Sequence, residues 1–137
     1  MLLKIKNIVF TRAFGLCEYC KSPANISSQS FVIEHIIAKS KNGTSNLDNL
    51  ALACQGCNNH KYNKLIGFDF ISKIEVDLFH PRLDIWSEHF SWSDDTLQVI
   101  GITATGRVTI EHLKLNRIEL LNLRHLLFNA GNHPPIV

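Results

Sequence analysis

Four cysteines, an acid-histidine pair and two asparagines are the residues whose types and spacing suit metal chemistry. The cysteines form two Cys-x-x-Cys pairs separated by thirty-three residues, namely Cys17, Cys20, Cys54 and Cys57. Two such pairs present four thiolates, which complete the tetrahedral shell of a structural zinc ion. We therefore expect Zn²⁺ at the cysteines, and we expect any catalysis to come from other side chains.

The side chains beside this frame suit phosphodiester hydrolysis, which needs an activated water and a divalent ion. His35 has an ordinary pKa of about 6.5 and suits a general base at neutral pH. The carboxylate of Glu34 and the amide oxygen of Asn58 suit a hard ion such as Mg²⁺ or Mn²⁺. Because neighbours in a strand point to opposite faces, Glu34 and His35 share a site only if the strand ends there.

The elements expected from hydrophobic periodicity and turn residues position this set. A strand-loop-strand-helix run would carry Glu34, His35, Asn49 and Asn58, and a preceding helix would carry the first cysteine pair. In order, we expect a helix over 4–14, a strand over 31–34, a polar loop over 39–48 with a turn at Asn42-Gly43, a strand over 50–53 and a helix over 55–65.

The second half of the chain is predicted less completely. Alternating Trp86, Phe90 and Trp92 favour a hairpin over 85–103 and belong to a core face more readily than to a base-stacking surface. Leucines over 113–127 predict a helix, with a capping box from Asn116 to Glu119. Residues 66–81 carry no readable pattern. Arg107 and Arg117 are expected to be surface or salt-bridge groups.

Residues 17–64 resemble the HNH endonuclease family, through the ordered acid-His pair, central asparagine and cysteine-framed asparagine. The resemblance implies a ββα-metal (His-Me finger) fold in which His35 is the general base and Glu34 binds the metal. It also implies that Asn49 holds the loop and orients His35. This chain has Asn58 where the family usually has histidine, as in members similar to phage junction-resolving enzymes. The region from Trp86 onward resembles an extension on some small bacterial members.

Charge is distributed unevenly along the chain, although the formal net charge is only +2. Through residue 64 there are eight basic residues against three acidic ones, and the rest of the chain is net acidic. A basic half that also holds the candidate site favours a phosphate-backbone ligand. We expect phosphate contacts from four lysines, Lys39, Lys41, Lys61 and Lys64.

The overall expectation is an α+β protein of 137 residues with a ββα-metal motif framed by a four-cysteine zinc site, then a C-terminal β-hairpin and helix. One domain over 1–137 would have its core at 17–64, with 66–137 as an extension packing on it. The first nine residues lack the apolar run of a signal peptide or membrane span, which favours a cytoplasmic protein with reduced thiols and no membrane partner.

These features predict a divalent-metal-dependent endonuclease that acts on DNA. Two alternatives remain open. The first is a non-catalytic zinc-ribbon module that binds nucleic acid through the same frame and basic half. The second is a protein-interaction domain with structural zinc, which explains the cysteines but leaves the acid-His-Asn pattern accidental.

Overall fold

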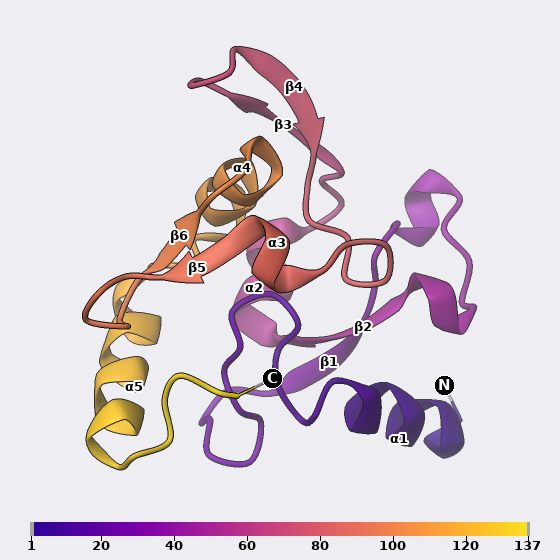
Figure 1. Ribbon diagram of the computed structural model, residues 1–137. Helices are drawn as coiled ribbons and strands as arrows, with labels where there is room; N and C mark the ends of the chain where they lie inside the picture. The colour runs from indigo at the N-terminus through magenta and orange to yellow at the C-terminus, as the bar shows by residue number, and fades with distance from the viewer. Residues whose placement is uncertain (1, 137) are drawn as a thin grey trace.

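The chain forms three separate antiparallel strand pairs packed among helices (Figure 1). The computed structural model describes residues 2–136. Each pair joins strands that are neighbours in the sequence, β1 with β2, β3 with β4 and β5 with β6. An isolated two-stranded hairpin is marginally stable, so each pair depends on what covers it. The predicted α+β class is confirmed.

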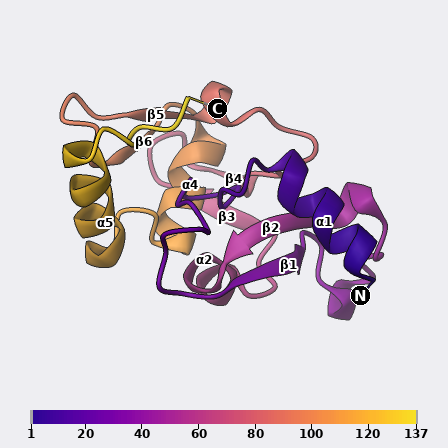
Figure 2. The same cartoon turned by 90° about the horizontal axis from the view of Figure 1, so that it is seen from below.

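The first hairpin carries the acid-histidine pair and lies against the N-terminal helix (Figure 2). Helix α1 spans Leu3–Arg12, strand β1 spans Phe31–His35 and strand β2 spans Leu50–Cys54. The ends of the three elements differ from the predicted ones by at most two residues. Since β1 includes both residues of the acid-histidine pair, the strand does not end between them.

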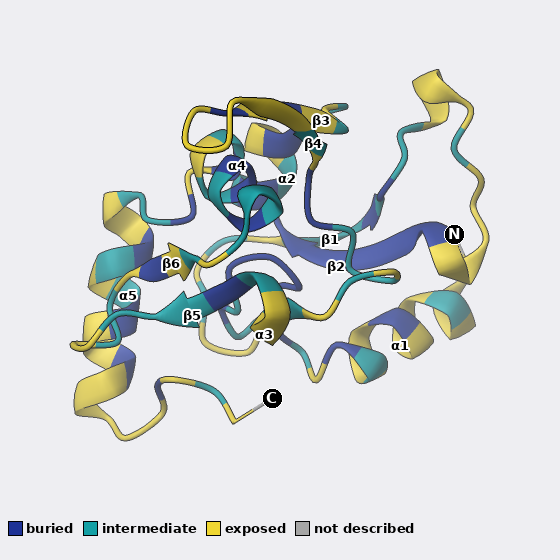
Figure 3. Cartoon of the chain, turned by 45° about the horizontal axis from the view of Figure 1, so that its top comes forward, coloured by how far each residue is buried: buried dark blue, intermediate teal, exposed yellow. Residues whose placement is uncertain are grey.

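Packing covers both faces of strand β2, which is buried along its whole length (Figure 3). On one face Leu50 and Leu52 pack with Val9 of α1 and with the partly buried Ile33. Ala51 and Ala53 lie on the other face by strand alternation, where their small side chains leave room for a helix. The run of apolar residues in β2 follows from this two-sided burial.

Helix α2 (Gln55–Lys61) follows β2 without a connecting loop. Between the strands, the chain makes two short 3₁₀ turns at Lys39–Lys41 and Leu47–Asn49. Asn42 adopts a left-handed φ of 68°, as the predicted turn requires. The helix ends earlier than the predicted residue 65, because Tyr62 takes a positive φ of 53° and redirects the chain.

A second hairpin lies within residues 66–81, for which the sequence gave no structural prediction. Strands β3 (Ile66–Asp69) and β4 (Ile74–Asp77) pair with each other, and β3 lies against α4 (Ala104–Leu113). The inward positions of β3 are Gly67 and Asp69, whereas its apolar side chains are exposed. The alternation is therefore inverted relative to an ordinary half-buried strand. Composition alone could not reveal which face is inward.

An ion pair fixes this hairpin on α4. Arg107 donates through Nε and Nη2 to the two carboxylate oxygens of Asp69, at 2.9 and 2.8 Å. The paired arginine and two hydrogen bonds from Ser72 hold the pKa of Asp69 well below its usual range. The predicted salt-bridge role of Arg107 is confirmed.

The predicted hairpin over 85–103 is correct only in its later part. Strands β5 (Phe90–Trp92) and β6 (Val99–Gly101) pair as expected, but Trp86–His89 form the short helix α3. The helical turn brings the ring of Trp86 to 5.0 Å from that of Phe90. The three aromatics therefore pack together without sharing one strand, and they belong to the core as predicted.

The predicted single helix over 113–127 is wrong at its start. Helix α4 ends at Leu113, where Lys114 takes a left-handed φ of 53°, and α5 spans Ile118–Asn129. Asn116 does not cap α5. Its side chain instead accepts from the backbone N–H of Val99 at 2.7 Å and donates to the same residue's carbonyl at 2.9 Å. A tertiary contact with β6 replaces the predicted capping box.

One buried cluster joins the cysteine region to the second half of the chain. Cys54 and Cys57 pack in it with Phe79, Phe90 and Leu113. The two halves thus bury apolar surface against each other. No helix within residues 2–136 is long and apolar enough to cross a membrane.

We predict that Phe90→Ala lowers the free energy of unfolding by about 3–5 kcal/mol, because it empties a fully buried aromatic site. The rings of Phe79 and Trp86 lie 5.3 and 5.0 Å from that of Phe90 and would border the cavity. Urea unfolding followed by tryptophan fluorescence measures the loss. The control is Phe70→Ala, since Phe70 is 72% exposed and should change stability little. Equal effects of the two substitutions would contradict this account of the core.

Candidate functional site

Four cysteine thiols meet at the junction of β2, α2 and the turn that follows α1. One sulfur from each of Cys17, Cys20, Cys54 and Cys57 lies within 4.8 Å of the others, and all four residues are buried. The backbone N–H of Cys20 points at the sulfur of Cys17 (3.5 Å), and that of Cys57 at the sulfur of Cys54 (3.4 Å). The two pairs therefore form matching tight turns. The predicted convergence is confirmed.

This donor set fits a metal ion such as zinc. The thiols are not linked in disulfides, and four sulfur donors are the usual tetrahedral set of a structural site. Such a set leaves no position for water, which is typical of structural metal sites. His60, the other residue near the second pair that could bind zinc, is exposed and lies outside the cluster.

His35, the candidate general base, ends β1 and is partly buried. Its Nε2 lies 3.0 Å from the hydroxyl oxygen of Ser45 in the loop between the strands. Burial of the ring, followed by the charge of Lys39, lowers the pKa of His35 below its ordinary value. The imidazole is consequently neutral at physiological pH, which is the form that accepts a proton.

Asn49 ties the loop to the end of β1. Its Oδ1 accepts from the backbone N–H of Ile37 at 2.8 Å, and its Nδ2 donates to the carbonyls of Ile37 (3.0 Å) and Thr44 (2.7 Å). The expected loop-holding contacts are present. Its side chain makes no hydrogen bond to His35 within the described residues, so any orienting effect passes through Thr44 to its neighbour Ser45.

Glu34 points away from His35, as strand alternation requires. Its side chain is buried, and Oε1 lies 2.6 Å from the ammonium of Lys61 on α2. Burial raises the pKa of Glu34, and Lys61 opposes that rise. Apart from the ion pair with Lys61, its two carboxylate oxygens are buried without an ordinary hydrogen bond in the described part of the chain, and the hydroxyl of Tyr19 also opposes the rise in pKa.

Lys61 is buried, although the sequence predicted that it would contact phosphate. It is 1% exposed, and besides Glu34 it donates to the carbonyl of Ile36 at 2.7 Å. A buried ammonium engaged twice inside the protein cannot reach a phosphate backbone in this conformation. The prediction for Lys61 is therefore wrong, because the residue clamps α2 to β1. Lys39, Lys41 and Lys64 are exposed, so phosphate contact by them stays a prediction.

Asn58 follows Cys57 in the first turn of α2 and is partly buried. Within residues 2–136 its side-chain amide makes no hydrogen bond. The oxygens of Glu34 and Asn58 are of the type that a hard divalent ion prefers. Because Glu34 and His35 lie on opposite faces of β1, the expected sharing of one site by these two residues is not formed in this conformation.

A cavity of about 310 Å³ lies beside Lys61. Its lining includes His80, whose Nδ1 accepts from the backbone N–H groups of Arg82 and Leu83, each at 3.2 Å. These contacts leave the proton of the neutral ring on Nε2. The sequence offered no signal for His80, because it follows β4 in the stretch that carried no readable pattern.

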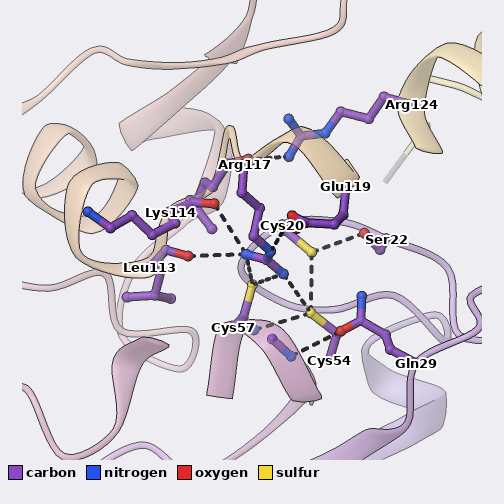
Figure 4. Close-up of polar contacts among 12 residues, drawn as sticks. Cys20, Ser22, Gln29, Cys54, Cys57, Leu113, Lys114, Arg117, Glu119 and Arg124 are labelled. Atoms are coloured by element: carbon purple, nitrogen blue, oxygen red, sulfur yellow. Dashed lines mark hydrogen bonds and ion pairs between the residues drawn. The ribbon is translucent and has the colours of Figure 1, made fainter. Parts of the chain in front are cut away.

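Arg117 has a different role from the surface or salt-bridge group that the sequence predicted. Its guanidinium lies against the cysteine cluster, 3.6 Å from the sulfur of Cys57 and 3.5 Å from that of Cys54 (Figure 4). The predicted salt bridge is only a 4.0 Å contact with the exposed carboxylate of Glu119. Sixty residues separate Arg117 from Cys57, so no local spacing could have indicated this contact.

We predict that the protein binds one zinc ion per chain and that Cys57→Ser abolishes stable binding, because the tetrahedral set loses a thiolate. Native mass spectrometry gives the stoichiometry, and thermal unfolding before and after chelation gives the stabilisation. His60→Ala is the control and should retain the metal. Retention of zinc by Cys57→Ser, together with its loss from His60→Ala, would contradict the assignment of the metal to the four cysteines.

The model of the HNH endonuclease family matches residues 17–64. No curated protein and no solved structure matches the chain. The matched segment begins at the first cysteine and contains the β1–β2 hairpin, the four thiols and α2. Residues 17–64 of this small protein are therefore similar to the HNH endonuclease domain.

Proposed function

We propose that this protein is a divalent-metal-dependent endonuclease that hydrolyses DNA phosphodiester bonds, with His35 as general base. The family match supports nuclease activity. The observation that carries the residue assignment is the contact of His35 Nε2 with the Ser45 hydroxyl, in a loop that Asn49 ties to β1. A positioned imidazole of lowered pKa suits removal of a proton from water.

The hydrogen bond to Ser45 suggests which nitrogen of His35 acts. When Nε2 carries the proton and donates to the Ser45 hydroxyl, Nδ1 is the unprotonated nitrogen. Nδ1 then accepts the proton of the attacking water while Ser45 holds the ring. Asn49 acts as a positioning residue, since its amide fixes the carbonyl of Thr44 next to Ser45.

The divalent ion, Mg²⁺ or Mn²⁺, would be held by Glu34 and Asn58. When bound, it would neutralise charge on the scissile phosphate and stabilise the leaving oxygen. In the described conformation Glu34 is buried, paired with Lys61 and on the face of β1 opposite His35, so holding an ion that acts together with His35 requires Glu34 to leave Lys61 and turn toward that face. The order of β1, β2 and α2 is that of a ββα-metal motif, which we propose for residues 17–64, with 66–137 as an extension packing on it in one domain.

DNA would approach the basic half of the chain. Lys39 and Lys41 lie in the same exposed loop as Ser45, and the exposed Lys64 follows α2. Each lysine that neutralises a phosphate adds a salt-dependent increment of affinity. A location in the cytoplasm, where thiols stay reduced, would suit the four-cysteine site.

A non-catalytic zinc-ribbon module that binds nucleic acid is the second candidate. The ion pair of Glu34 and Lys61 favours it, since a carboxylate already neutralised by an ammonium has less need of a divalent ion. The two candidates differ in one respect that is easily measured. A module that only binds DNA does not cleave it, whichever divalent metal ion is added.

We predict metal-dependent nicking of supercoiled plasmid in Mg²⁺ or Mn²⁺ and none in EDTA. His35→Ala should lower the rate by about 10²–10⁴-fold, because it removes the general base, while zinc content and unfolding temperature stay unchanged. His125→Ala on the exposed side of α5 is the matched control and should cut normally. Full activity in His35→Ala would overturn its role. Salt-sensitive binding without cutting by the wild-type protein would favour the zinc-ribbon module.

The pH dependence offers a separate prediction. Since His35 acts in its neutral form and its pKa lies below the ordinary value, kcat/KM should rise with pH and level off before neutrality. Lys39 contributes to the lowered pKa, so Lys39→Gln should move this acidic limb to higher pH. Lys73→Gln, in the distant β3–β4 turn, should leave it in place. If the acidic limb of the kcat/KM profile lay at the same pH in Lys39→Gln and Lys73→Gln, the electrostatic role of Lys39 would be contradicted.

A further inference from the structure

Arg117 lies between helices α4 and α5 and directs its guanidinium at the second cysteine pair. Nη1 lies 3.6 Å from the sulfur of Cys57, and Nη2 lies 3.5 and 3.7 Å from those of Cys54 and Cys57. Figure 4 shows the planar group spanning the two sulfurs. Arginine offers several N–H donors in a rigid fork, so one side chain can serve two acceptors.

The end of α4 holds the guanidinium in this position. Nη1 also donates to the carbonyls of Leu113 at 3.1 Å and Lys114 at 3.2 Å. These carbonyls lie at the C-terminal end of the helix, where unsatisfied carbonyls favour a cation. The Arg117 side chain is 13% exposed. It is therefore a fixed, largely desolvated cation and not a mobile surface group.

Helix α2 leaves room for the guanidinium at one position. A Cβ added to Gly56 would lie 2.6 Å from Nη2 of Arg117, closer than atoms tolerate. The φ of Gly56 is not in the left-handed region, so the backbone does not demand glycine there. The missing side chain instead matches the close approach of Arg117. The cysteine turn and the distant arginine are sterically complementary.

Charge explains why a cation belongs at this place. Four thiolates around a divalent ion carry a net charge of −2, and burying that charge is costly unless it is compensated. Two other cations lie nearby without contacting a sulfur. Arg124 donates to the carbonyls of Leu97 and Leu115, and Lys21 stacks over the ring of Trp86. Within the described residues, Arg117 is the cation that donates directly to the thiols.

We propose that Arg117 is an outer-shell residue of the four-cysteine metal site, which stabilises the metal-bound thiolates of Cys54 and Cys57 and couples metal binding to the packing of α4 and α5. Outer-shell partners of metal ligands tune affinity as well as orientation. The proposal rests on the metal site and not on nuclease activity. Its test therefore measures metal binding alone.

The test compares zinc affinity, by competition with a chromophoric chelator, among full-length variants. Arg117→Ala should bind zinc about 10–100-fold more weakly, as expected for loss of an outer-shell partner. Arg117→Lys should lose less, because it keeps the charge but not the fork. The matched control is Lys114→Asn, which removes a neighbouring exposed charge and suits the left-handed backbone there. It should bind zinc like the wild type.

A spectroscopic readout separates a metal role from simple packing. In the Co²⁺-loaded protein, hydrogen bonds to thiolates stabilise the sulfur electrons, so their removal in Arg117→Ala should shift the sulfur-to-cobalt charge-transfer band to lower energy. Gly56→Ala keeps the arginine but crowds it, and should shift the band and weaken zinc binding in the same direction. This variant keeps the test decisive if Arg117→Ala does not fold. Unchanged affinity and band position in both folded variants would overturn the proposal, as would a wild-type protein that binds no metal.

Discussion

The meeting of four cysteine thiols is the constraint on which the rest of the structure depends. Each of the three strand pairs is too small to be stable alone, so their arrangement must come from contacts between distant segments. The thiols supply such contacts by joining the turn after α1 to the end of β2 and the start of α2. Arg117 extends the connection to the junction of α4 and α5. A metal ion at this point would hold elements from both halves of the chain.

The four-cysteine cluster also determines where the candidate catalytic residues lie. Because Cys54 ends β2 and begins the turn into α2, the strand and the helix have a fixed relation, and Lys61 then clamps α2 to β1 through Glu34. His35 lies on the opposite face of β1, where Asn49 and Ser45 secure it. Two sets of contacts, one on each face of a single strand, therefore hold Glu34 and His35 in separate surroundings.

The sequence predicted the first half of the fold well, because local signals there agree with tertiary packing. Strand β2 is a buried apolar run and β1 begins with three partly buried apolar residues, and the cysteine spacing brought four thiols together as expected. Prediction failed where a distant contact decided the outcome. In β3 the glycine and aspartate face inward toward α4, and Asn116 pairs with Val99 instead of capping a helix. Likewise, the burial of Lys61 and the sulfur contacts of Arg117 depend on partners 27 and 60 residues away.

We propose two separate metal sites, one at the four cysteines that supports the fold and one at Glu34 and Asn58 that would act on DNA. Electron paramagnetic resonance of Mn²⁺ added to the zinc-loaded protein, with a non-cleavable phosphorothioate duplex present, tests this claim most directly. The account predicts one bound Mn²⁺ per chain with zinc retained, and loss of the Mn²⁺ alone in Glu34→Gln. The absence of a Mn²⁺ site, or displacement of zinc by Mn²⁺, would contradict it.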